Sequence, residues 1–158
     1  MAIKVKTGSE STILSVGAYR PARLVPNSEI VDLIDSSDEW IVQRTGIESR
    51  RFAGADESVV DMAIGAAEQA LTRAKLTITD VDAVVVSTIT YPHQAPSAAT
   101  AVIQRMGHPT AAAFDISAAC AGFCYGVAMA HDMVRAGSAK KVLVIGVEKI
   151  SDFTDPTD

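Results

Sequence analysis

The sequence predicts an α/β fold in which a mostly parallel sheet is covered by helices. Three short apolar runs, Val81–Ser87, Ala112–Ile116 and Lys141–Val147, have the composition of strands that are buried on both faces. The stretches between them carry apolar residues at the three- and four-residue spacing of helices. Strands and helices that alternate in this way form parallel sheets, because each helix carries the chain back across the sheet. The 158 residues match the size of one domain, and no Pro-, Gly- or Ser-rich linker divides them.

The composition argues against several classes of protein. Hydrophobic residues make up 48% of the chain and charged residues 21%, which is typical of a globular domain and not of a disordered or collagen-like chain. With 14 Lys and Arg against 19 Asp and Glu, the net charge of −5 argues against a nucleic-acid partner. Two Cys are too few for a disulfide scaffold, so we expect reduced thiols and a cytoplasmic protein.

The most apolar window, Ala111–Ala130, is long enough to suggest a membrane span. Asp115 lies inside this window and Gly122 and Gly126 interrupt it, and an acidic residue in the middle of a span is costly. We therefore interpret the window as a strand followed by a buried helix, and expect no association with membranes. Residues Met1–Ser15 lack the unbroken apolar core of a targeting signal.

Short elements are predicted in the first third of the chain. Ser11–Tyr19 is a short run with β-branched residues that ends before a proline, which indicates a strand followed by a loop. Asn27 is suited to cap a short helix over Ser28–Ile34. Ile47–Phe52 reads as an extended piece.

A second short helix is predicted before this extended piece, with Ser36 or Ser37 as its cap and its end near Gly46. Trp40 and Arg44 lie four residues apart, so they share one face of this helix. A flat indole beside a guanidinium can sandwich a nucleotide base and contact phosphates. The alternative is that the indole packs on the core and the guanidinium pairs with a nearby carboxylate.

Three longer helices are predicted in the rest of the chain. Ser58 can cap the first, with Asp61 three positions on. Its apolar and small residues recur at helical spacing: Val59, Val60, Ala63, Ile64, Ala67, Ala70, Leu71 and Ala74. Ser97–Met106 and Ala119–Ala136 read as the other two, each followed by a glycine that can end a helix. Thr88–Pro96 reads as a loop.

Cys120 gives the strongest local signal for chemistry. It lies at the predicted start of a helix, directly after a buried strand and a turn of small residues. Free backbone N–H groups and the helix dipole at such a position stabilise a thiolate, which is the nucleophilic form of cysteine. The same N–H groups can serve in an oxyanion hole. The alternative is a buried structural cysteine, because free Cys is among the most buried residue types.

Cys124 and the three His residues do not form a recognisable metal or catalytic site in the sequence. Cys124 lies one helical turn after Cys120, but neither has a convincing further partner, so we expect no metal and interpret Cys124 as a small core residue. His93 lies in a loop and can face a cleft, whereas His108 lies between Gly and Pro and is expected at the surface. His131 is about 16 Å along the helix from Cys120, too far to act as its base.

Three stretches together resemble β-ketoacyl-acyl-carrier-protein synthase III, the priming condensing enzyme of bacterial fatty-acid synthesis: Asp35–Ile47, Phe114–Phe123 and Asp155–Asp158. The resemblance runs from about Ile13 to the end of the chain. It implies the thiolase-like fold, in which two similar α/β halves form a layered α-β-α-β-α core. It also implies that residues 1–158 are the N-terminal half, that the C-terminal half is absent from this chain, and that the protein is a homodimer.

The resemblance implies roles for individual residues. Cys120 matches the nucleophile that takes an acyl group from acyl-CoA as a thioester, and its backbone N–H matches an oxyanion donor. Trp40 and Arg44 match residues that hold the adenine end of CoA, and Ser36 matches a polar contact nearby. Ala95 matches a position that lines the acyl pocket across the dimer interface, where a small residue leaves room for branched or longer acyl groups. Neither a metal nor a redox cofactor is implied, since the CoA thioester is a substrate.

The implied reaction is an acyl transfer followed by decarboxylative condensation with malonyl-acyl carrier protein, which gives β-ketoacyl-acyl carrier protein, CO2 and CoA. The family's catalytic His and Asn lie in its second half and cannot be placed in this chain. The final segment, Ser151–Asp158, ends without a finishing element, which indicates a truncated or divided protein. Two alternatives remain: a related starter-unit synthase for polyketides or quinolones, and a non-catalytic half that serves in dimerisation or docking.

Overall fold

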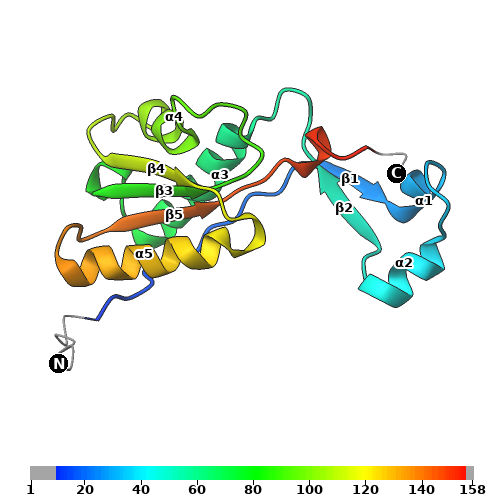
Figure 1. The fold of residues 1–158 in the computed structure, drawn as a ribbon, viewed down its shortest axis with the longest axis horizontal. Helices are drawn as coiled ribbons and strands as arrows, with labels where there is room; N and C mark the ends of the chain where they lie inside the picture. Colours follow the sequence, from blue (N-terminus) through cyan, green and yellow to red (C-terminus); the bar gives the residue numbers. More distant parts are fainter. Residues whose placement is uncertain (1–9, 156–158) are drawn as a thin grey trace, which may run out of the picture.

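The computed structural model describes residues 10–155, and its main body is a parallel sheet between helices (Figure 1). The sheet has the strand order β4–β3–β5, formed by β3 (Ala83–Ser87), β4 (Ala112–Ile116) and β5 (Val142–Gly146). Both strand pairs are parallel, with Ser87 opposite Ile116 on one side and opposite Gly146 on the other. This confirms the α/β class and the three strands that the sequence predicts.

Helices cover both faces of this sheet. α3 (Val59–Ala74) and α4 (Ala98–Arg105) lie on one face, and α5 (Gly122–Ala136) lies on the other (Figure 1). α3 and α4 begin and end within one residue of the positions that the sequence predicts. Ser58 and Ser97 accept bonds from backbone amides at the two helix starts.

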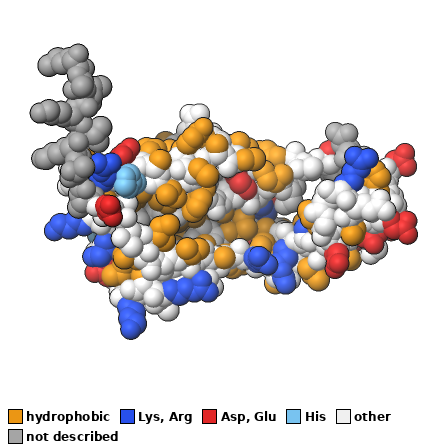
Figure 2. Space-filling model, turned by 90° about the horizontal axis from the view of Figure 1, so that it is seen from below, with side chains coloured by type: hydrophobic (Ala, Val, Ile, Leu, Met, Phe, Trp, Pro, Cys, Tyr) orange, Lys and Arg blue, Asp and Glu red, His pale blue; other side chains and the backbone are white. Residues whose placement is uncertain are grey.

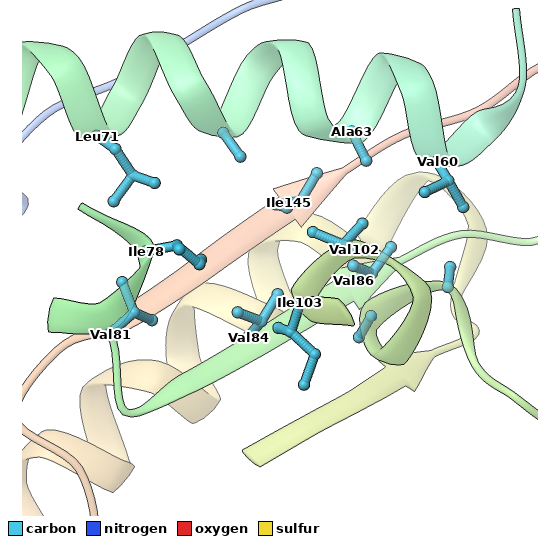
Figure 3. Packing of buried hydrophobic residues seen from close by; sticks show 13 residues of the cluster. Val60, Ala63, Leu71, Ile78, Val81, Val84, Val86, Val102, Ile103 and Ile145 are labelled. Atoms are coloured by element: carbon cyan, nitrogen blue, oxygen red, sulfur yellow. The ribbon is translucent and has the colours of Figure 1, made fainter. Parts of the chain in front are cut away.

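The central strand β3 explains why its residues are apolar at successive positions. Val84 and Val86 point toward α3 and α4, where they join the main apolar cluster (Figure 3). Val85 points to the opposite face, since a Cβ built on Gly126 of α5 would lie 3.8 Å from its Cγ1. All three valines are fully buried, so each contributes to a layer of the core.

A smaller lobe lies beyond one end of the sheet (Figure 1). It contains an antiparallel pair of strands and two short helices: β1 (Arg23–Pro26), α1 (Asn27–Val31), α2 (Asp38–Thr45) and β2 (Ser49–Phe52). α2 begins and ends as expected, because Ser37 accepts the Trp40 amide at 3.2 Å and Gly46 adopts a left-handed conformation with φ +70°.

The predicted start of the first short helix is wrong by one residue, and its end by three. Asn27 is the first residue of α1 and not its cap, and the helix stops at Val31 rather than at Ile34. The Asn27 side chain is buried and donates to Asp38 Oδ1 at 2.6 Å and to the Ile47 carbonyl at 2.7 Å. The Asn27 side chain therefore does not cap α1 but links α1 to α2.

The predicted strand at Ser11–Tyr19 is absent from the described structure. The segment follows α3 instead: the Ser15 hydroxyl donates to the Ala70 carbonyl at 2.7 Å, and the Ala18 amide donates to Gln69 Oε1 at 3.0 Å. Arg73 donates to the Val16 carbonyl at 2.6 Å. These polar groups of the segment thus bond to α3, in place of a neighbouring strand.

α5 begins three residues later than predicted. Ala119–Ala121 forms a 3-10 turn, and the α-helix starts at Gly122 rather than at Ala119. Its end agrees with the prediction, because Gly137 closes it with φ +79°. Near the C-terminus a short 3-10 helix spans Ile150–Asp152, and the predicted polar residues Pro156–Asp158 lie outside the described residues.

α5 presents an apolar face that the described residues leave open. Figure 2 shows hydrophobic side chains gathered on this side of the molecule. Four large side chains of α5 are exposed, Phe123, Tyr125, Val127 and Met129, and two of them, Phe123 and Val127, line a groove beside the helix. A groove of about 1710 Å³ runs between α5, α3, β5 and the segment that begins at Glu10. Among residues 10–155, no helix combines the length and apolar character needed to span a membrane.

Asp61 joins the start of α3 to the end of α4. Its carboxylate accepts the Ser58 hydroxyl and the Ser58 amide, the latter at 2.8 Å, and it pairs with Arg105 at 2.6 Å. The bonds from Ser58, and then the guanidinium of Arg105, lower the pKa of Asp61 from 3.8 to about 2.

We expect Asp61 to make the fold more sensitive to acid. Because the Asp61 pKa is lower in the folded state, its contacts stabilise the fold above the unfolded pKa of 3.8 and are lost as the pH falls toward about 2. Asp61→Asn cannot titrate, so its Tm should fall less than that of the wild type between about pH 5 and about pH 2. Thermal unfolding followed by circular dichroism measures this, and equal falls would contradict the prediction.

Candidate functional site

Three segments leave the central sheet at one edge. Because the strands are parallel and Ser87, Ile116 and Gly146 lie side by side, the chain emerges from all three strands at the same place. The carboxyl ends of parallel strands are the usual position of ligand sites in α/β proteins. The small lobe lies on this side of the sheet (Figure 1).

Cys120 follows β4 at this edge. The turn that carries it is tight: Ala119 has φ +44°, a left-handed conformation that alanine rarely adopts, and the Ala121 amide donates to the Ala118 carbonyl at 3.1 Å. The Cys120 thiol is free and exposed. Of the two sequence interpretations, the buried structural cysteine is therefore wrong, and a side chain open to a substrate agrees with the structure. Backbone strain of this kind is concentrated at functional sites.

Glycines bring this turn close to the sheet. A Cβ on Gly122 would overlap the Ser87 hydroxyl oxygen and lie 3.1 Å from the Ser87 Cβ. A Cβ on Gly126, one helical turn later, would lie 2.9 Å from Val144 Cγ1. The two glycines therefore allow α5 to pack closely against the sheet. This close packing sets the position of the Cys120 turn relative to the ends of the strands.

Cys124 does not lie in the core, contrary to the sequence interpretation. Its side chain is exposed and lines the groove along α5, because the described residues do not cover this face of the helix. Within residues 10–155, no group of three or more His, Cys, Asp and Glu side chains is placed to hold a metal ion.

None of the described contacts links a histidine to Cys120. His131 bonds through Nδ1 to the Ser11 hydroxyl at 2.6 Å, on the far part of α5. His108, expected at the surface, is half-buried because its Nε2 lies 3.1 Å from the Val81 carbonyl oxygen. His93 is exposed in the loop after β3, with its ring edge-on to Tyr91 at 5.5 Å.

Trp40 and Arg44 share one face of α2, as their spacing predicts. The Arg44 guanidinium lies over the Trp40 ring at 4.9 Å, and 53% of Trp40 is exposed. The prediction that the indole packs on the core is therefore wrong. The stacked pair offers a flat, positively charged surface to solvent.

Beside this pair lies a small cavity of about 440 Å³ lined by Ile34, Asp35, Ser36, Ser37 and Trp40. The Ser36 hydroxyl is buried and has no hydrogen-bond partner among the described residues. Because buried polar groups are nearly always bonded, a hydroxyl without a partner beside a cavity is a candidate for bonding a ligand. The neighbouring Ser37 is occupied as the cap of α2.

Ala95 lies in the loop after β3, between the strand and α4, and its side chain is exposed. The start and the end of this loop are bonded to two carboxylates that sequence reasoning did not single out as site residues, Glu148 and Asp115. Their positions in the sequence could have indicated them, since each is an acidic residue at or just beyond the carboxyl end of an apolar strand. What they bind could not be predicted, because their partners lie 16 to 59 residues away.

The site thus has two parts in separate bodies of the fold. Cys120 and the loop of Ala95 lie at the edge of the central sheet, whereas Trp40, Arg44 and Ser36 lie in the small lobe. An exposed thiol on a strained turn can attack an electrophile, and a stacked cation with an unsatisfied hydroxyl can bind a nucleotide.

The sequence has many relatives of one kind. Residues 114–158 match the family model described as 3-Oxoacyl-[acyl-carrier-protein (ACP)] synthase III. The chain is 51% identical over 147 residues to the Beta-ketoacyl-[acyl-carrier-protein] synthase III of Kocuria rhizophila, covering 93% of this chain and 41% of that protein. It is 53% identical over 146 residues to Beta-ketoacyl-[acyl-carrier-protein] synthase III 1 of Streptomyces coelicolor, covering 92% and 43%. The chain thus spans less than half the length of these relatives.

Solved structures agree in fold. The priming β-ketosynthase from the R1128 polyketide biosynthetic pathway superposes with a TM-score of 0.92 at 41% identity, covering 100% of this chain and 47% of that one. The 3-oxoacyl-[acyl-carrier-protein] synthase III of Aquifex aeolicus gives a TM-score of 0.89 at 40% identity, covering 92% and 47%. The fold class predicted from the resemblance is therefore confirmed.

Proposed function

Because this chain belongs to the β-ketoacyl-[acyl-carrier-protein] synthase III family and corresponds to its N-terminal half, we propose that it carries the acyl-accepting part of a priming condensing enzyme. Its substrate in this role is an acyl-CoA, and its product is an acyl thioester on Cys120. The observation that supports the proposal most directly is the exposed Cys120 thiol on the strained turn at the carboxyl edge of the sheet.

In the proposed first step the Cys120 thiolate attacks the carbonyl carbon of the acyl-CoA thioester. A new carbon–sulfur bond forms to Cys120, the bond from carbon to the CoA sulfur breaks, and CoA leaves as a thiolate that takes up a proton. The backbone N–H of Cys120, at the turn before α5, is the proposed donor to the oxyanion of the tetrahedral intermediate. Exposure of the thiol supports this step, because a long acyl-CoA has to reach it.

The proposed second step is decarboxylative condensation with malonyl-acyl carrier protein. Loss of CO2 from the malonyl group leaves an enolate whose carbon attacks the acyl-Cys120 carbonyl, which releases Cys120 and gives β-ketoacyl-acyl carrier protein. This step needs the His and Asn of the family's second half, so we propose it for the whole homodimeric, cytoplasmic protein and not for residues 1–158. Neither step calls for a metal or redox cofactor.

The proposed CoA site is the stacked surface of Trp40 and Arg44 with the cavity beside it. An adenine ring stacks on the indole, the guanidinium contacts phosphate, and the unsatisfied Ser36 hydroxyl bonds a polar group of the nucleotide. Ala95 is proposed to line the acyl pocket, where its small side chain leaves room for branched or longer acyl groups.

Trp40→Ala is expected to weaken CoA binding about tenfold, because stacking of a base on an aromatic ring contributes about 1–3 kcal/mol. Isothermal titration with CoA measures the Kd. Trp40→Phe keeps a ring in place and should lose less. A Kd for Trp40→Ala equal to that of the wild type would remove this surface from the proposed site.

The proposed function is tested by incubating the protein with acetyl-CoA and measuring its intact mass and the free CoA released. We expect one acetyl group per chain, an equal amount of CoA, and an adduct that hydroxylamine removes, as it does thioesters. A well-folded protein that gains no mass would refute the acyl transfer and favour the third interpretation, a non-catalytic half that serves in dimerisation or docking.

A second candidate function keeps this chemistry and changes the pathway. The similarity to the priming β-ketosynthase of the R1128 polyketide pathway, with a TM-score of 0.92, supports a starter-unit synthase. The acyl-CoA profile separates the two. Acetyl-CoA or short branched acyl-CoA as the best donor favours fatty-acid priming, whereas a dedicated starter acyl group favours polyketide synthesis.

A further inference from the structure

The loop between β3 and α4, residues 88–97, is held near each end by a carboxylate: Glu148, just beyond β5, bonds to its first residues, and Asp115 of β4 bonds to the first residues of α4. Its middle, residues 92–96, is exposed and includes Ala95. A loop that is bonded at its ends and open between them takes a path that depends on how those ends are held. The two carboxylates therefore hold the residues on either side of the exposed stretch that contains Ala95.

Glu148, just beyond β5, holds the first end. Its carboxylate accepts the Ile89 amide at 3.0 Å, the Thr90 amide at 3.1 Å and the Thr90 hydroxyl at 2.6 Å. The Thr88 hydroxyl adds a fourth, longer contact at 3.2 Å. Four donor groups thus converge on one carboxylate, which holds the first turn of the loop.

The next residue continues this network. The Lys149 amide donates to the Thr90 hydroxyl oxygen at 2.9 Å, and its ammonium bonds the Gly54 carbonyl at 3.0 Å and Asp152 at 3.3 Å. The first turn of the loop is therefore fixed between the end of β5 and the segment before α3. Thr90 itself is buried although the loop beyond it is open.

Asp115 of β4 holds the second end. Its two oxygens accept the amides of Ala98 and Ala99, at 2.7 and 2.8 Å, in the first turn of α4. Asp115 precedes Cys120 by five residues, and the Thr88 amide bonds the Ile116 carbonyl at 3.2 Å. The loop is thus attached at both ends to the strand ends from which Cys120 emerges.

We propose that Glu148 is a positioning residue that sets the acyl-group preference of Cys120. It acts through the first turn of the 88–97 loop, which fixes the place of Ala95, and it makes no contact with the reacting atoms. This inference rests on the proposed function, since it concerns the acyl group that Cys120 takes. The ligand class it concerns is the acyl chain of the CoA thioester.

A matched carboxylate on the opposite edge of the sheet separates positioning from stability. Asp82, before β3, accepts the amides of Lys140 and Lys141 at 2.6 and 2.9 Å, so it also fixes a connecting segment through backbone N–H groups. It lies at the amino ends of the strands, away from Cys120. Loss of Asp82 should destabilise the protein without altering the choice of acyl group.

The test compares acylation rates with acetyl-CoA and octanoyl-CoA, measured by intact mass, for the wild type, Glu148→Ala, Glu148→Gln and Asp82→Ala. We expect Glu148→Ala to raise the ratio of octanoyl to acetyl transfer about tenfold, because a released loop leaves more room in the acyl pocket that Ala95 is proposed to line. Glu148→Gln keeps one acceptor oxygen and should give an intermediate ratio. It also serves as the readout where Glu148→Ala does not fold. Asp82→Ala should keep the wild-type ratio.

Two failures can be told apart. If the wild type is acylated and both Glu148 variants keep its ratio, or if Asp82→Ala shifts the ratio equally, the positioning role is refuted and the proposed function stands. If the wild type takes neither acyl group, the proposed function fails, and the role of Glu148 fails with it.

Discussion

Cys120→Ala is expected to stay unmodified when incubated with acetyl-CoA, with acylation reduced by at least about three orders of magnitude, because no other group replaces the attacking sulfur. The substitution removes one exposed atom from a turn that the backbone itself holds, so the fold and the Tm should change little. Intact-mass measurement over time gives the rate, and circular dichroism checks the fold.

Cys124→Ala is the matched control for this experiment. Cys124 is also free and exposed, lies one helical turn away, and differs in that it is inside α5 rather than on the turn before it. Its variant should be acylated at the wild-type rate. An adduct that persists in Cys120→Ala, or that peptide mapping places on Cys124, would show that exposure alone accounts for the reactivity.

Gly122→Ala is expected to lower both stability and the rate of acylation. The added methyl group would overlap the Ser87 hydroxyl, so the start of α5 has to move away from β3 and carry the Cys120 turn with it. Overpacking of this kind costs about 1–3 kcal/mol, and we expect acylation to slow by at least about tenfold. Urea unfolding and the intact-mass assay measure the two effects.

The double variant Ser87→Ala with Gly122→Ala shows whether this overlap is the cause. Removing the hydroxyl leaves the Ser87 Cβ at 3.1 Å from the new methyl group, which is tight but possible with a small shift. Part of the stability and of the rate should therefore return. Wild-type behaviour of Gly122→Ala, or no recovery in the double variant, would contradict the close approach of α5 to β3 as the determinant of the site.

Helix boundaries were predictable where local signals decide them. Ser58, Ser97 and Gly137 stand at the ends of helices as capping chemistry requires. The strand at Ser11–Tyr19 was predicted wrongly, because its β-branched residues indicate an extended chain but not the neighbour to which that chain bonds. Ser15 and Ala18 bond to α3, at residues that lie more than fifty positions later in the sequence.

For the candidate site, too, some features could be predicted from local sequence and others could not. The order of strand, small-residue turn and helix around Cys120, and the four-residue spacing of Trp40 and Arg44, are local patterns that could be read directly. The exposure of Cys124 and the half-burial of His108 were not predictable, because burial depends on which elements cover a side chain. Sequence spacing gives the face of a helix but not what packs on it.

The sequence by itself determined the α/β class, the three buried strands and the place of Cys120 on a turn between a strand and a helix, because each is a matter of composition and short-range pattern. Only the tertiary structure decided that Glu148 and Asp115 bond to the two ends of the segment that joins β3 to α4. A carboxylate can bond any amide that comes within reach, and the amides that do so are chosen by the parallel register of strands that lie far apart in the chain.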